Sequence, residues 1–124
     1  MTFTIPGELP SLNEYIHAIN RNRHIGNKLK QDTQGAIQWA IRAQIARGYE
    51  ITHPVQIRFL WASRTAKKDI DNVAFSKKFI LDAMVTMGIL PNDTRKWVKG
   101  FKDEFVIDRQ HPRTEVEITP YEIH

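Results

Sequence analysis

The chain contains no cysteine, which excludes disulfide bridges and thiolate metal ligands. Hydrophobic residues make up 41% of the chain and charged residues 26%, close to globular averages, so neither disorder nor a fibrous repeat is indicated. No run of about 18 apolar residues occurs, and the amino terminus lacks a charged start followed by an apolar segment. We therefore expect a single folded domain over residues 1–124, in the cytoplasm, without a membrane span.

Several well-known site signatures are missing as well. The chain has no Gly-x-x-x-x-Gly-Lys phosphate loop, no Gly-x-Gly-x-x-Gly fingerprint and no Gly-x-Ser-x-Gly elbow. Its five histidines are scattered without a His-Glu-x-x-His pair, so a zinc site has little support. An EF-hand loop is excluded because Val73 stands where a third oxygen ligand would be required.

The apolar residues that are present recur with clear periods. Helical spacing predicts helices over about residues 30–47 and 71–87, each followed by a glycine. Alternation predicts strands around residues 3–5, 55–61, 97–107 and 114–118. The segment 10–27, rich in Asn, Arg and His, has no clear period and is expected to be a long functional loop. These elements predict an α/β fold of the α+β type, a single domain with two main helices packed on a mixed sheet of about four strands.

The positive charge is clustered. The formal net charge is +4 with an isoelectric point near 9.5, a modest excess that by itself fits many proteins. Three groups lie beside predicted loops: Arg21, Arg23, His24, Lys28 and Lys30; Arg64, Lys67 and Lys68; Arg95, Lys96, Lys99 and Lys102. One such group would fit an ordinary solvated face. Three of them together favour a polyanionic partner such as a nucleic-acid backbone.

Asp69 and Asp71, followed by Asn72, stand at the start of the second predicted helix. Capping alone would explain them, because Asp and Asn accept hydrogen bonds from the free amides of a helix start. On one continuous helix, however, Lys78 and Asp82 would project within about 20° of Asp71, while most of the circumference is apolar. A charged stripe on a buried helix must be paired or line a cleft, so a structural ion pair and a functional site both remain open.

The chemistry of these side chains indicates which kind of functional site they could form. Carboxylate oxygens without imidazole or thiolate favour hard cations, above all Mg²⁺ or Mn²⁺. Such ions hold phosphate oxygens and activate water in phosphodiester cleavage. Beside basic loops, the acidic cluster therefore indicates a metal-dependent nuclease.

Taken in order, the motifs resemble those of the RusA family of Holliday-junction resolvases over most of the chain. The matching pieces are Pro10-Ser11-Leu12-Asn13 for Pro-Ser-x-Asn, Asp69-Ile70-Asp71-Asn72 for Asp-x-Asp-Asn, Lys78 with Asp82-Ala83 for Lys-x-x-x-Asp-Ala, and Asn92-Asp93 for an acidic pair after a turn. Asn92 departs from the family pattern, in which both residues of the pair are commonly acidic. One potential metal ligand is therefore neutral in this chain.

The resemblance implies a homodimeric, Mg²⁺-dependent endonuclease, bacterial or phage-encoded, that nicks two opposed strands of four-way DNA junctions in recombination and repair. Mn²⁺ is expected to substitute for Mg²⁺. The resemblance assigns Asp69, Asp71 and Asp93 to the metal and to catalysis, with Lys78 as the essential lysine. Lys77 is the alternative lysine, but on a continuous helix it points about 120° away from the aspartate line.

Supporting and DNA-binding roles complete the assignment. Asn13, Asn72 and Asp82 are expected to support the site, and the candidates for DNA contacts are Arg21, Arg23, Lys67, Lys68 and Arg95. Trp97 could stack on a base, but its alternation with Phe101 favours a place in the core. Two alternative functions remain open: a less selective metal-dependent nuclease on branched or single-stranded nucleic acid, and a non-catalytic DNA-binding module whose aspartates only cap a helix.

Overall fold

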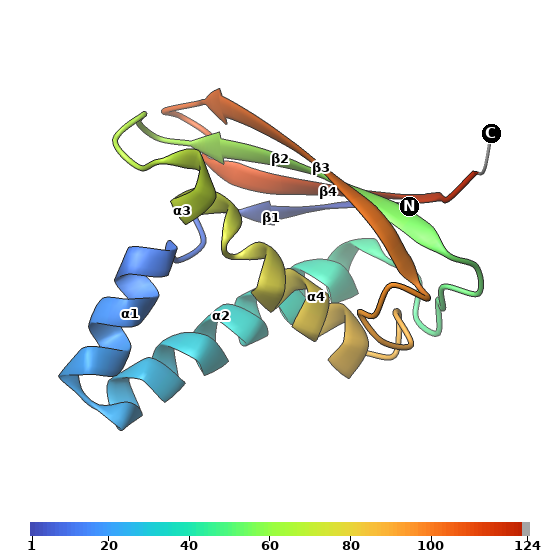
Figure 1. Cartoon of the computed structure of the whole chain (residues 1–124), viewed down its shortest axis with the longest axis horizontal. Helices are drawn as coiled ribbons and strands as arrows, with labels where there is room; N and C mark the ends of the chain where they lie inside the picture. The colour runs from blue at the N-terminus through green and yellow to red at the C-terminus, as the bar shows by residue number, and fades with distance from the viewer. Residues whose placement is uncertain (123–124) are drawn as a thin grey trace.

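A computed structural model describes residues 1–122, which form four helices and a four-stranded mixed sheet (Figure 1). In chain order the elements are β1 (Thr2–Pro6), α1 (Leu12–Arg21), α2 (Arg23–Gln44), β2 (Val55–Ser63), α3 (Ile70–Ala74), α4 (Lys77–Thr86), β3 (Val98–Ile107) and β4 (Arg113–Pro120). The strand order is β1-β4-β2-β3, with β2 and β3 parallel and the other neighbours antiparallel. The predicted α+β class and the four predicted strands are confirmed.

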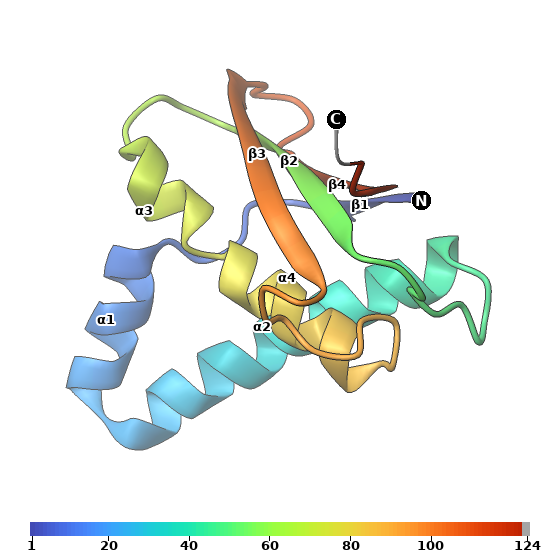
Figure 2. The same cartoon turned by 45° about the vertical axis from the view of Figure 1, so that its right-hand side comes forward.

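The connection between β2 and β3 determines where the acidic motif lies. Parallel strands cannot be joined by a tight hairpin, so the chain crosses one face of the sheet as α3 and α4. Consequently α3 follows the carboxyl end of β2, the end of a parallel strand at which α/β proteins generally bind ligands (Figure 2).

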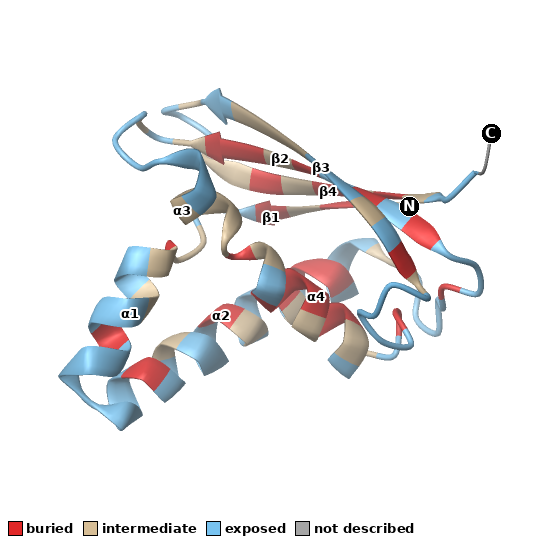
Figure 3. Cartoon of the chain, in the orientation of Figure 1, coloured by how far each residue is buried: buried red, intermediate tan, exposed pale blue. Residues whose placement is uncertain are grey.

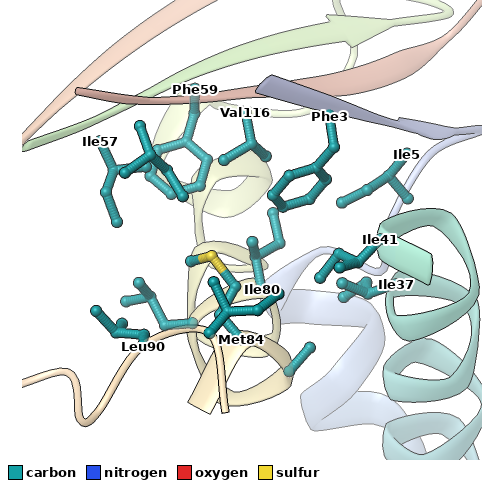
Figure 4. Close-up of a cluster of buried hydrophobic side chains, with 14 of the residues drawn as sticks. Phe3, Ile5, Ile37, Ile41, Ile57, Phe59, Ile80, Met84, Leu90 and Val116 are labelled. Atoms are coloured by element: carbon teal, nitrogen blue, oxygen red, sulfur yellow. The ribbon is translucent and has the colours of Figure 1, made fainter. Parts of the chain in front are cut away.

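The core fills the space between the sheet and the helices α2 and α4 (Figure 4). The inward side chains are Phe3, Ile5, Ile57, Phe59 and Val116 from the strands, facing Ile37, Ile41, Ile80, Met84 and Leu90. Neighbouring strand positions such as Arg58 and Glu115 point to the other face of the sheet and are more exposed (Figure 3). Each fully buried aliphatic or aromatic side chain contributes about 1.5–3 kcal/mol to folding.

No helix in the described chain is long and apolar enough to cross a membrane.

The prediction of a long loop over residues 10–27 is wrong, because most of this segment is helical. The hydroxyl of Ser11 accepts the backbone N–H of Glu14, and the Glu14 carboxylate accepts the backbone N–H of Ser11. This capping box starts α1. The side chain of Asn22 then accepts the N–H of Ile25 at 2.9 Å and starts α2. The helix predicted over residues 30–47 therefore begins earlier, at Arg23, and ends at Gln44.

The helix predicted over residues 71–87 is divided in two. Ser76 is completely buried and donates its hydroxyl hydrogen to the carbonyl oxygen of Pro10. At this point the N–H of Lys78 bonds to the carbonyl of Phe75, three residues back, instead of four. The break changes the direction of the chain between α3 and α4 (Figure 1). The angular extrapolation from Asp71 to Lys78 assumed one regular helix, so it does not hold across the break.

Candidate metal and nucleic-acid site

The acidic motif lies on α3, exposed to solvent beside the carboxyl end of β2. Asp69 is the N-cap residue of α3, yet its side chain makes no capping hydrogen bond. Asp71 lies in the first turn, where its carboxylate accepts the backbone N–H of Asn72 at 2.9 Å. Capping therefore does not account for the Asp69 carboxylate, which remains available to a ligand.

Two motifs far apart in the sequence meet at α3. The backbone N–H of Asn13 donates to Asn72 Oδ1 at 2.9 Å, across 59 positions of the chain. The Tyr15 ring lies 5.7 Å from that of Phe75 and 5.4 Å from that of Phe79. The start of α1 thus holds α3 in place, which gives two of the three predicted supporting residues, Asn13 and Asn72, a positioning contact.

Lys68 is engaged within the protein. Its Nζ lies 2.5 Å from Glu14 Oε1 and 3.9 Å from Glu8 Oε2. Partial burial acts to raise the pKa of Glu14, but hydrogen bonds from Lys68 and Ser11 outweigh it and lower that pKa below its usual value. Lys67 is exposed, and its backbone N–H bonds to the Thr65 hydroxyl. Of the two lysines proposed to contact DNA, Lys67 is therefore the one without a carboxylate partner within 4 Å among residues 1–122.

The neighbouring lysines of α4 point in different directions. Lys78 is exposed, and its Nζ lies 3.6 Å from Asp82 Oδ1. Lys77 is mostly buried, and its Nζ lies 2.7 Å from Asp103 Oδ2 and 4.4 Å from the Phe101 ring centre. The second oxygen of Asp103 accepts the indole N–H of Trp61 at 2.9 Å. Lys78 is thus the lysine that an incoming phosphate can reach, and the pair it forms with Asp82 matches the i, i+4 pairing considered from the sequence.

Sequence reasoning missed Asp103, although one signal was readable. It is a charged residue between Phe101 and Phe105 on the inward side of β3, a side that is otherwise apolar. A carboxylate in that position requires a cation or hydrogen-bond donors. Lys77 and Trp61 supply them.

We expect Asp103→Ala to lower the free energy of unfolding by about 1–3 kcal/mol, because it leaves the Lys77 ammonium and the Trp61 indole without an acceptor. Urea denaturation measures the change. The double variant Lys77→Met/Asp103→Leu should recover part of the loss, since it removes the unpaired ammonium and leaves only the Trp61 indole without an acceptor. The control Asp32→Ala breaks the exposed Lys28–Asp32 pair and should change stability by no more than about 0.5 kcal/mol. Equal stabilities of Asp103→Ala and wild type would contradict this account of the pair.

Asp93 lies apart from the other two aspartates within one chain. It is exposed in the loop between α4 and β3, whereas Asp71 precedes α4 (Figure 1). The ten residues of α4 alone span ~15 Å. Asp93 lines a surface groove with Asp82 and Lys30 instead. Among residues 1–122, no three acidic or histidine side chains lie close enough together to hold a metal ion, so the three-aspartate site stays a prediction.

The loop that carries Asp93 has a defined structure. Asn92 Oδ1 accepts the backbone N–H of Thr94 at 3.1 Å, so the neutral side chain shapes the turn that presents Asp93. Arg95 is exposed and lines a second groove with Asp93 and Lys99. Trp97 is half-buried and packs against the core, which supports the core role favoured from its alternation.

Comparison with known proteins adds one match. The family model described as "Endodeoxyribonuclease RusA" matches residues 6–119, nearly the whole chain. A search of curated proteins returned no match.

Proposed function

Because this chain belongs to the RusA endodeoxyribonuclease family, we propose that it is a Mg²⁺-dependent endonuclease that resolves four-way DNA junctions by symmetric paired nicks. We assign it to DNA recombination and repair in the cytoplasm of a bacterium or phage-infected cell. The observation that carries the catalytic assignment is the exposed pair Asp69 and Asp71 at the carboxyl end of β2, with the Asp69 carboxylate free of any capping bond.

The donor set of α3 fits a hard divalent cation. Asp69 and Asp71 offer carboxylate oxygens only, the ligands that Mg²⁺ prefers and that Mn²⁺ also accepts. When bound there, the ion would supply an activated water and neutralise charge on the scissile phosphate. Asn72 and Asn13 hold the backbone that carries both carboxylates, so the pair is positioned before DNA arrives.

Lys78 is proposed to bind the scissile phosphate. Its exposed ammonium can exchange the 3.6 Å contact with Asp82 for a phosphate oxygen, because a surface ion pair of this kind is worth only about 0.2–0.5 kcal/mol. A lysine near the scissile phosphate stabilises the charge that develops as the bond breaks. Lys77 cannot make the same exchange without leaving Asp103 unpaired.

We place Asp93 in the site of a second copy of the chain. One chain holds Asp69 and Asp71 at the start of α3 and Asp93 beyond the end of α4. A third aspartate that binds the same metal ion would therefore come from a second subunit. A two-fold dimer that brings α3 of one copy to the α4–β3 loop of the other would complete two equivalent sites. Two equivalent sites suit a reaction that needs two equivalent nicks.

The test uses a labelled four-way junction, a flap, a single strand and a matched linear duplex, each with Mg²⁺ and with a chelator. We expect paired nicks on the junction that require the metal, and no cutting of the duplex. Cutting of single strands or flaps at a rate similar to that of the junction would indicate the less selective nuclease. Junction binding without any metal-dependent cutting would indicate a non-catalytic binding module.

A further inference from the structure

The helical hairpin of α1 and the first half of α2 carries an unusual share of the charge. Four of the 18 Lys and Arg residues, and none of the 14 Asp and Glu residues, lie between positions 15 and 31. The formal charge of +4 of the whole chain therefore resides in this segment, and the remaining residues balance to zero. Asn22 forms the corner between α1 and α2. Figures 1 and 2 show the hairpin projecting away from the sheet, with the turn between these two helices at its far end.

The same hairpin exposes large aliphatic side chains. Ile16, Ile19 and Ile25 are 44%, 45% and 38% exposed, and Figure 3 shows that the residues around the corner are mostly exposed. Ile19 lies against Gly26, where an added Cβ would come within 3.0 Å of Ile19 Cγ1. This close approach joins the two helices, so the isoleucines and the corner cations Arg21 and Arg23 belong to one rigid element.

The hairpin is anchored at the candidate site. The base of α1 is tied to α3 by the hydrogen bond from Asn13 to Asn72 and by the Tyr15–Phe75 ring contact. The ten residues of α1 place the corner ~15 Å from that base. A ligand held at the corner would therefore be distinct from the phosphate at Asp71 but could belong to the same DNA molecule.

Resting on the proposed function, we infer that this hairpin recognises branched DNA: its cations hold phosphates, and Ile16 and Ile25 contact bases exposed where stacking is interrupted at the junction. Apolar side chains bordered by cations are typical of proteins that insert wedges between base steps. Charge favours DNA over a second copy of the chain, because two hairpins facing each other would bring like charges together.

The inference is tested with a junction carrying the fluorescent base 2-aminopurine beside the branch point, in the presence of a chelator so that nothing is cut. Binding of wild type should increase the fluorescence, which reports an unstacked base. The double variant Ile16→Ala/Ile25→Ala should lose most of that increase and bind the junction at least about tenfold more weakly. Its affinity for a linear duplex should not change, since the cations remain.

Val106→Ala is the matched control, because Val106 is 40% exposed but lies on β3. It should behave as wild type. Alanine favours helix formation, so the double variant should keep its fold, which circular dichroism would verify.

The inference would be overturned if wild type bound the junction without any increase in fluorescence. It would also be overturned if the double variant lost junction and duplex affinity equally. Conversion of a wild-type dimer to a monomer by the double variant, seen by light scattering, would make the surface a subunit interface and also overturn it. A separate assay, cleavage of the junction by wild type with and without metal, tests the proposed function.

Discussion

Replacing Asp71 with asparagine is expected to reduce junction cleavage at least about 100-fold, equivalent to ~2.7 kcal/mol of transition-state stabilisation. The substitution removes a charged metal ligand with almost no change in shape. Junction binding should be retained or become tighter, because one negative charge leaves a phosphate-binding surface. Asparagine is also a good residue for a helix start, so α3 should persist and the loss would be chemical.

Single-turnover cleavage of a labelled junction in Mg²⁺ measures this effect, and a filter or gel assay in chelator measures binding. Asp32→Asn is the matched control, since Asp32 is an exposed carboxylate on α2 away from α3. It should cut at the wild-type rate. Wild-type cleavage by Asp71→Asn would remove Asp71 from the metal site and favour a role confined to the helix start.

Mixed dimers of two inactive variants should regain activity. We expect Asp71→Asn and Asp93→Asn each to be inactive alone. If Asp93 completes the partner's site, a dimer with one subunit of each kind has one intact site, made of Asp71 from one subunit and Asp93 from the other. One of the two sites in each mixed dimer is intact, so purified mixed dimers should show about half of the wild-type nicking. Those dimers should nick only one strand of each junction.

The experiment requires that the subunits be exchanged, for example by co-expression with two different tags and purification through both. Dimers purified in this way from two copies of Asp71→Asn provide the background rate. Inactive mixed dimers, with both single variants inactive, would place all three aspartates in one chain. An active Asp93→Asn homodimer would remove Asp93 from the site altogether.

The strands and the core could be predicted because their signals are local. Residues 55–61 and 114–118 alternate with the period of a strand that buries one face, and both segments lie in strands. The high apolar content of the second predicted helix indicated burial, and five residues of α4 are buried. These features depend on neighbours within a few positions, which the sequence displays directly.

The helices at segment 10–27 and the break at Ser76 were not predicted. Polar composition obscured the capping box of Ser11 and Glu14, although its spacing was readable. The break coincides with a hydrogen bond from Ser76 to Pro10, 66 positions away, which no local pattern reveals. The preference for Lys78 rested on a regular helix, which the break interrupts, so it stays a prediction. The structure adds that Lys78 is exposed, whereas Asp103 engages Lys77.

By itself, the sequence determined which side chains are available to this protein: carboxylates without cysteine or a histidine cluster, basic clusters, and ordered motifs that identify a family of nucleases. Only the tertiary structure decided which of these residues meet. Asn13 touches Asn72, and Lys77 pairs with Asp103, while Asp93 stays at the other end of α4 from Asp71. The physical reason is that residue types set what a side chain can bind, whereas contacts between distant positions depend on how whole elements pack.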